Sequence, residues 1–473
     1  GVGNFAITGS AQNDTILGGG GEDSMTAGAG NDSIVGNGGA DLFTFSGNLT
    51  SADTIAGGSG TDTLTFTDAG GATNELDNVT TVETITLGDA ATNVTTVTAL
   101  VTGTNTLTVS ASALTGSNTL TWTGSAETDG GKFSITGSGQ NDTIIGGSGA
   151  DTIDGAAGND SITGGGGADS ILGGIGNDSL NFASGAELAL DSTVDGGSDN
   201  DTVIFTATVT DLDDTDFARV KNIEAVSLAG GDNTASFGTN AGSASGAGAL
   251  TITSGTGNDT INVSALAKAV NISSDNGTDQ IILGTNLTSA DTIAGGSGTD
   301  TLTFTDAGGA TNDLDNVTTV ETITLGNAAT AVTTVDGLVA SGSTLTVDGS
   351  ALSGNALTFD GALEADGKFS ITGGDAADAI TGGAGNDSIS GGAQNDTITG
   401  NAGADSITAG TGDDRLLGGN DGDTFVLAAN LTSADTVTGG SGTDTLTFTD
   451  AGGATNELDN VTTVETITLG DAA

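Results

Sequence analysis

Acidic side chains that recur every nine residues are the part of this chain that could do chemistry. From Gly137 the sequence reads GSGQNDTII, GGSGADTID, GAAGNDSIT, GGGGADSIL and GGIGNDSLN, so that an aspartate stands sixth in each nonapeptide. These sixth positions are Asp142, Asp151, Asp160, Asp169 and Asp178. Carboxylates repeated in this way supply the oxygen ligands that a hard cation requires.

Two further arrays repeat the pattern, one from Gly9 to Thr44 and one from Gly373 to Val426. Their sixth positions hold Asp14, Asp23, Asp32 and Asp41 in the first case and Asp378, Asp387, Asp396, Asp405, Asp414 and Asp423 in the second. Isolated copies of the motif carry Asp62, Asp201, Asp259, Asp279, Asp300 and Asp444. All of these aspartates are candidate metal ligands.

The nonapeptide predicts a tight turn followed by a very short strand. Glycines at its first, second and fourth positions permit positive φ and close backbone approach, and the last three residues place one aliphatic side chain inward. Two such units make one coil of 18 residues, so Asp142 and Asp160 should stack in one column and Asp151 and Asp169 in the opposite one. Stacked strands put these like charges about 4.8 Å apart, which is unfavourable without a cation between them. Calcium is the best candidate for that cation.

The composition excludes several functional classes. The 473 residues include no His and no Cys, which removes the usual nucleophile–base pairs and zinc ligands. Against 61 acidic residues stand 6 basic ones, a formal charge of −55, so nucleic acid is not an expected partner. No apolar run is long enough to span a membrane, and membrane insertion is not expected. The regular aliphatic positions argue against disorder, and the periodic carboxylates argue against an enzyme site, which is normally a singular constellation.

A longer period divides the chain into segments. A threonine-rich unit begins at Asn48, recurs from Asn286 and starts again at Asn430, stopping partway at Ala473, which indicates a fragment of a longer repetitive polypeptide. We expect nonapeptide segments at 1–47, 132–195 and 368–429, threonine-rich spacers at 48–131 and 286–367, a spacer with isolated motifs at 196–285, and a truncated spacer at 430–473.

A second pattern places a glutamate about one coil after certain aspartates. Glu83, Glu321 and Glu465 each follow the aspartate of an isolated motif by 21 residues, and Glu224 follows by 23. Their partners in this spacing are Asp62, Asp300, Asp444 and Asp201, respectively. Two interpretations remain open, a calcium site shared by each pair and a glutamate that caps loop amides, of which we favour the second.

The nonapeptides follow the pattern GGxGxDxUx, with U an aliphatic residue, and so resemble the RTX repeats of bacterial proteins secreted by type I systems. That resemblance implies calcium-binding parallel β-rolls. Departures occur where Ala376 and Gln394 replace the fourth glycine, and those two loops are expected to bind calcium less well or not at all. The combination GGxGxDTL…VExIxL resembles bacterial RTX surface-layer proteins and related large surface proteins, which implies a secreted, cell-surface location.

The predicted fold is all-β and elongated, with parallel β-roll segments alternating with further β-solenoid or β-sandwich-like spacers and almost no helix. The predicted function is that of a calcium-dependent structural protein of the bacterial exterior, assembling with copies of itself into a surface layer or fibre. Cell-surface polysaccharide is a further candidate partner. Alternatives are the extender of a large adhesin and an ice-binding solenoid, the latter disfavoured because TLTFT does not recur coil after coil. Trp122 is expected to be a packed side chain.

Overall fold

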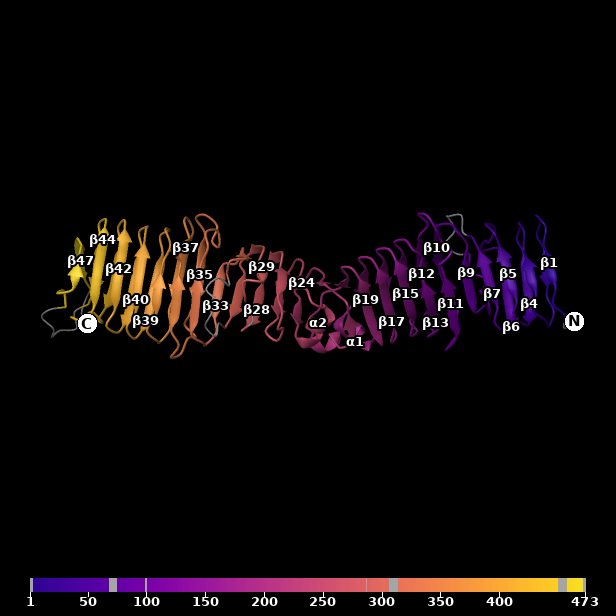
Figure 1. Cartoon of the computed structure of the whole chain (residues 1–473), viewed down its shortest axis with the longest axis horizontal. Helices are drawn as coiled ribbons and strands as arrows, with labels where there is room; N and C mark the ends of the chain where they lie inside the picture. The colour runs from indigo at the N-terminus through magenta and orange to yellow at the C-terminus, as the bar shows by residue number, and fades with distance from the viewer. Residues whose placement is uncertain are drawn as a thin grey trace. The chain divides into compact units, whose positions relative to one another are not determined.

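The computed structural model describes residues 3–67, 75–97, 100–285, 287–305, 314–449 and 457–470. Gly1, Asn286 and Ala473, at which predicted segments begin or end, lie outside these residues. The chain divides into two compact units, residues 1–227 with 243–248 and residues 228–242 with 249–473. Each unit is a parallel β-solenoid in which successive coils stack strand upon strand (Figure 1).

In the first unit, alternate strands form one continuous parallel sheet. Its strands are, in order, β1 (Ala6–Thr8), β3 (Ser24–Thr26), β5 (Leu42–Phe45), β7 (Thr63–Phe66), β9 (Thr84–Leu87), β11 (Thr106–Ser110), β13 (Lys132–Thr136), β15 (Thr152–Ala157), β17 (Ser170–Ile175), β19 (Thr193–Ser198) and β21 (Val220–Lys221). The intervening strands stack separately as β2 (Thr15–Leu17), β4 (Ser33–Gly38), β6 (Thr54–Ser59) and β8 (Val79–Thr80), and then β10 (Thr92–Thr95), β12 (Leu120–Thr123), β14 (Thr143–Ile145), β16 (Ser161–Thr163), β18 (Ser179–Phe182), β20 (Thr202–Phe205) and β22 (Ala225–Ser227).

The second unit repeats this plan. One sheet contains β23 (Thr234–Ser236), β25 (Thr260–Asn262), β28 (Gln280–Gly284), β31 (Thr301–Phe304), β33 (Thr322–Leu325), β35 (Thr344–Asp348), β37 (Lys368–Thr372), β39 (Ser388–Ala393), β41 (Ser406–Thr411), β43 (Thr424–Ala428), β45 (Thr445–Phe448) and β47 (Thr466–Leu469). Its other stacks are β24 (Leu250–Thr253), β26 (Val270–Ser273), β29 (Thr292–Ala294) and β32 (Val317–Thr318), then β34 (Thr330–Thr333), β36 (Leu357–Asp360), β38 (Ala379–Thr381), β40 (Thr397–Asn401), β42 (Arg415–Asn420), β44 (Thr436–Ser441) and β46 (Val461–Thr462), with the short pair β27 (Asn276–Gly277) and β30 (Ser297–Gly298).

The core of each solenoid is a stack of inward aliphatic side chains, as the nonapeptide pattern predicts. Ile135, Ile153 and Ile171 lie in register on neighbouring strands and are each at most 1% exposed. Identical apolar residues stacked in this way bury their surface against one another, which is the main favourable term in folding. Trp122 is also fully buried and packs edge-to-face on Phe133 with ring centroids 5.5 Å apart, so it is a core side chain as expected.

The spacer segments continue the solenoid, which resolves the alternative between solenoid and sandwich. Within the arrays neighbouring coils are offset by 18 residues, as in the pairing of Ile153 with Ile171. In the first spacer the offset grows, and Val94 pairs with Trp122 across a longer coil. The extra residues of these longer coils are accommodated in the loops, so the parallel register of the strands persists.

Hydroxyl side chains form a column on the outer face of each long sheet. In the first unit Thr63, Thr84 and Thr108 are in register. In the second unit a column runs without interruption through Thr301, Thr322, Thr346, Ser370, Ser388, Ser406, Thr424, Thr445 and Thr466. The neighbouring column, which holds the second hydroxyl of each TxT pair, is interrupted by Asp348 and Val426, so paired TxT hydroxyls do not recur coil after coil, as predicted.

Helical structure is minor, as predicted. The described residues contain two six-residue helices, α1 (Gly185–Leu190) and α2 (Thr239–Ala244), and one 3-10 turn, η1 (Asp214–Phe217). Ser184 caps α1 by accepting a hydrogen bond from the amide of Glu187 at 3.2 Å. Among the described residues no helix has the length and apolar character needed to cross a bilayer.

Candidate metal centre

Each nonapeptide loop turns through its glycines and ends at its aspartate. In the loop from Gly155 to Asp160, the fourth residue Gly158 takes φ of 119°, a conformation that side-chain-bearing residues rarely adopt. Asp160 directly precedes β16 and is only 2% exposed, although it is an ionisable residue. The turn therefore places one carboxylate per loop on the inside of the bend.

Backbone amides hold these carboxylates in columns. The amide of Asp142 donates to Oδ1 of Asp160 at 2.8 Å, and the amide of Asp160 donates to Oδ1 of Asp178 at 2.8 Å. In the opposite column the amide of Asp151 donates to Oδ1 of Asp169 at 2.7 Å. The two columns lie where the 18-residue coil predicts them.

The same series of amide-to-carboxylate hydrogen bonds, called the ladder below, joins the predicted aspartates of the other arrays. In the first array the bonded pairs are Asp14 with Asp32, Asp23 with Asp41 and Asp41 with Asp62. In the second unit they are Asp259 with Asp279, Asp279 with Asp300, Asp378 with Asp396, Asp387 with Asp405, Asp396 with Asp414, Asp405 with Asp423 and Asp423 with Asp444. Asp178 likewise bonds to Asp201. Of all these residues Asp14 alone, at the start of its stack, is not buried.

The second carboxylate oxygen distinguishes the start of a stack from its interior. At the start, Oδ2 accepts an amide of its own loop, as in Gly147 to Asp151 at 2.7 Å and Gly383 to Asp387 at 2.8 Å. In most of the interior nonapeptide loops, Oδ2 is buried without a hydrogen-bond partner among the described residues. This holds for Asp41, Asp62, Asp160, Asp169, Asp178, Asp201, Asp259, Asp279, Asp300, Asp396, Asp405, Asp423 and Asp444. Because an unpaired buried charge is costly, these oxygens point to a missing partner.

A backbone carbonyl oxygen lies close to the unpaired Oδ2 in these loops. At Gly155, a Cβ would collide both with Oδ2 of Asp160 and with the carbonyl oxygen of Gly173, the first glycine of the next loop in the column. The corresponding space at Gly400 is bounded by Oδ2 of Asp405 and the carbonyl oxygen of Gly418. A carboxylate and a carbonyl directed into one space are the ligand types that calcium prefers, so the residues fit this ion.

Burial and mutual repulsion make these carboxylates hard to ionise in the absence of a cation. Burial is the main cause that raises the pKa of Asp160 to about 7, opposed by the hydrogen bond from the Asp142 amide and assisted by the neighbouring charges of Asp142 and Asp178. The pKa is likewise raised to about 7, chiefly by burial, at Asp169, Asp201, Asp396 and Asp405. A bound divalent cation would offset both effects.

Four ladder residues were not among the predicted ligands. The amides of Asp32, Asp169, Val270 and Asp414 donate to Oδ1 of Asp53, Asp191, Asp291 and Asp435, respectively, at 2.7–2.9 Å. Each of the four acceptors is 1% exposed. Their loops lack the glycines of the nonapeptide, which is why the motif missed them. A signal was present in the Asp-Thr-Ile or Asp-Thr-Val that follows three of these loops, since the same tripeptide ends many nonapeptide turns.

The glutamates of the second pattern cap amides, in agreement with the interpretation that we favoured. Oε2 of Glu83 accepts the amide of Asp62 at 2.9 Å, and Oε2 of Glu321 accepts the amide of Asp300 at 2.8 Å. Glu224 and Glu465 do the same for Asp201 and Asp444, both at 2.9 Å. Each glutamate therefore takes the place that the next aspartate would occupy in the column, and it ends that column.

The two departing loops differ in their backbones. Gln394 takes φ of 73°, the left-handed region that glycine occupies at the same position in other loops. Ala376 is not in that region, and the aspartate of its loop, Asp378, accepts the amide of Gly374 at 2.7 Å. The reduced calcium binding of both loops stays a prediction.

Comparison with known families agrees with this geometry. The family described as RTX calcium-binding nonapeptide repeat (4 copies) matches residues 7–43, 50–66, 134–162, 154–186, 287–304, 372–405, 390–425 and 432–448. The matched stretches 50–66, 287–304 and 432–448 contain Asp53, Asp291 and Asp435, whereas Asp201 and Asp279 lie outside the matches. No curated protein matches the chain. The chain thus carries RTX calcium-binding nonapeptide repeats that fold as a β-roll.

Proposed function

We propose that this RTX-repeat chain is a calcium-dependent structural protein of the bacterial cell exterior, and that copies of it assemble into a surface layer or fibre. The observation that carries the proposal is the column of buried aspartates, such as Asp142, Asp160 and Asp178, which recurs in both units. Chemistry that is repeated from coil to coil suits a scaffold, whereas an enzyme needs one distinctive constellation.

Calcium binding would supply much of the folding free energy. At a free calcium concentration ten times the Kd, one site contributes about 1.4 kcal/mol, so about ten sites would contribute on the order of 14 kcal/mol. That sum is comparable to the stability of a whole domain. Extracellular calcium modules bind at about 10⁻⁴–10⁻³ M, so the chain would stay unfolded in the cytosol and fold after type I secretion.

The acidic surface supports assembly through shared cations. The chain carries a formal charge of −55, and copies of it would repel one another unless calcium bridged their acidic faces. Cell-surface polysaccharide, with its own hydroxyl and acidic groups, is the proposed anchor. Negative-stain microscopy during a calcium titration tests this proposal. Sheets or filaments that form with calcium and disperse on chelation support it, and single rods at every calcium concentration favour the adhesin extender instead.

A second candidate function is ice binding, which the uninterrupted hydroxyl column of the second unit favours. Its strands place Thr322, Thr346 and Ser370 in register, and neighbouring strands are about 4.8 Å apart, so the hydroxyls form a regular array. Observation of single ice crystals growing in a solution of the calcium-loaded protein tests for ice binding. Faceted growth that Thr346→Tyr abolishes would support ice binding, and crystals that stay round would exclude it.

A further inference from the structure

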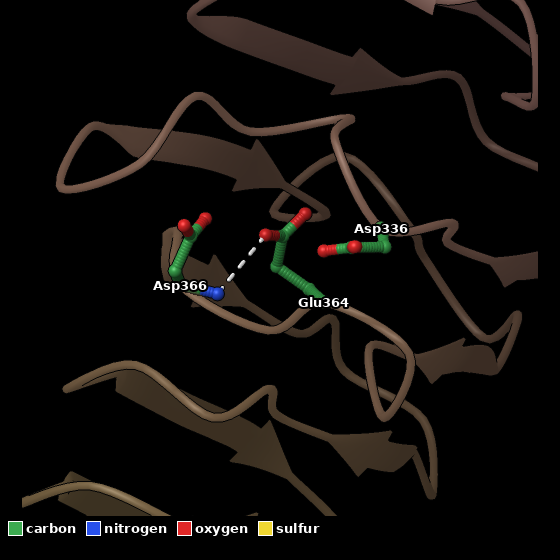
Figure 2. A group of neighbouring side chains, drawn as sticks. All are labelled: Asp336, Glu364 and Asp366. Atoms are coloured by element: carbon green, nitrogen blue, oxygen red, sulfur yellow. Dashed lines mark hydrogen bonds between the residues drawn. The ribbon is translucent and has the colours of Figure 1, made fainter.

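Two turns outside the nonapeptide loops contain carboxylates that the RTX repeats do not explain. In the second unit, the turn between β36 and β37 brings Glu364 and Asp366 beside Asp336. Carboxylate oxygens of these three residues all lie within 4.8 Å of one another, and Figure 2 shows the side chain of Asp336 extending toward Glu364. Glu364 lies against the nonapeptide loop that ends at Asp387, because its carbonyl oxygen accepts the amide of Ala384 at 2.9 Å, but none of the three residues belongs to a nonapeptide.

Glu364 is the buried member of this cluster. It is 1% exposed, whereas Asp336 and Asp366 are exposed. Its Oε2 accepts the amide of Val339 at 3.2 Å, and its Oε1 accepts the amide of Gly367 at 3.1 Å. These amides fix the orientation of the carboxylate and leave further lone pairs on its oxygens free for another partner.

The matching turn in the first unit supplies an independent sign of a missing ligand. Glu127 occupies the place of Glu364, is 0% exposed, and accepts the amide of Val101 at 3.2 Å through Oε2. Its Oε1 is buried and has no hydrogen-bond partner among the described residues, although the carboxylate of Asp129 lies beside it. A cation bound between the two carboxylates would give this buried oxygen a partner and offset the repulsion between the two side chains.

We propose that Asp336, Glu364 and Asp366 bind one calcium ion, and that Glu127 and Asp129 bind another in the equivalent turn. Calcium bonds to oxygen at about 2.3–2.6 Å, so oxygens around one ion lie at most about 5 Å apart. The 4.8 Å limit within the cluster meets that condition. The proposal does not depend on the nonapeptide loops, because no residue of the two sites belongs to one.

The two sites should differ in affinity. The sequence places Thr98 where the second unit has Asp336, so the first site has two carboxylates and the second has three. Because the charge of the ligand set tunes calcium affinity, the second site should bind more tightly. Asp336→Asn should then weaken the second site by about tenfold, toward the affinity of the first.

Native mass spectrometry of the calcium-loaded full chain tests the proposal by counting bound ions. Glu127→Gln with Glu364→Gln should lower the count by two. The double variant Asp129→Asn and Asp366→Asn should weaken the binding of the same two ions. Because both residues are exposed, this variant tests the sites even if the first variant misfolds. The matched control is Asp77→Asn with Asp315→Asn, which removes two exposed charges from the same two spacers and should leave the count unchanged.

The outcomes separate this inference from the proposed function. An unchanged count in both carboxylate variants would overturn the two sites while leaving the RTX sites intact, and it would indicate that Glu127 is protonated. A wild-type chain that binds no calcium at all would overturn both proposals. A loss of two ions in the carboxylate variants, with none lost in the control, is the expected result.

Discussion

The amide of Asp142 donates a hydrogen bond to Oδ1 of Asp160, one coil further along the solenoid, at 2.8 Å. An interior aspartate such as Asp160 therefore has two roles, because one oxygen closes the backbone of the preceding coil and the other faces the space assigned to calcium. Folding forces these charges together, and the ion relieves their repulsion. Stability and calcium binding are consequently properties of the same atoms.

Asp160→Asn separates these two roles, since an asparagine oxygen can still accept the Asp142 amide while the charge is lost. Without calcium the variant should be more stable than the wild type by about 1 kcal/mol, because a repelling buried charge is gone. With saturating calcium it should be less stable by about 1–2 kcal/mol, because one ligand is missing. Urea unfolding in calcium measures the second effect, and the pH at which the calcium-free chain gains β-structure on acidification in chelator shows the first. Asp77→Asn, at an exposed position, should change neither, and the same sign of effect in both buffers would contradict the ladder's dual role.

Gly155→Ala tests the space for the ion directly. Its Cβ would enter the space bounded by Oδ2 of Asp160 and the Gly173 carbonyl oxygen, so the variant should lose one calcium ion and about 1–3 kcal/mol of calcium-dependent stability. Gly139→Ala is the control, because no atom lies within 4 Å of its Cβ and its φ is not positive. Isothermal titration calorimetry would count the sites. Equal stoichiometry in the two variants would show that the ion lies elsewhere.

Acid should partly replace calcium. The folded pKa of Asp160 and Asp396 is raised by burial to about 7, above the value of an unfolded aspartate. Groups with raised folded pKa values contribute stability that is fully present below the unfolded pKa and is lost as pH rises through the folded pKa. In chelator, the chain should therefore gain β-structure as pH falls from about 8 to about 5, and its urea midpoint should rise with acidification once it is folded. With calcium the trend should reverse, because protons compete for the ligands. A calcium-free midpoint that falls with acidification would refute this assignment.

Gln394→Gly should stabilise the loop that departs from the nonapeptide pattern. Gln394 takes φ of 73°, and placing a side chain in the left-handed region costs about 1–2 kcal/mol, part of which glycine loses again through the greater freedom of the unfolded chain. A net gain of about 0.5–1 kcal/mol is expected in thermal or urea unfolding. Gln140 also stands fourth in its loop but does not have positive φ, so Gln140→Gly should give no gain. A gain in Gln140→Gly alone would refute the backbone explanation.

The columns could be predicted from the sequence because a strict period needs only one rule, that two nonapeptides make one coil. Asp160 and Asp178 follow from it directly. The rule fails where coil length varies, so the pairing of Val94 with Trp122 and the ladder position of Asp53 required the structure. The burial of Glu127 also required the structure, since its recurrence as Glu364 marks the position in the sequence, but only the neighbouring coils enclose the side chain.

Far-ultraviolet circular dichroism of the full chain during calcium titration and chelation tests the central claim most directly. We predict a coil-like spectrum in chelator at pH 7.5 and above, a cooperative gain of β-structure as calcium rises through about 10⁻⁴–10⁻³ M, and full reversal on chelation. A β-rich spectrum that persists in chelator, with an unfolding midpoint that calcium does not shift, would contradict the account. The buried carboxylates would then be stabilised by something other than the ion.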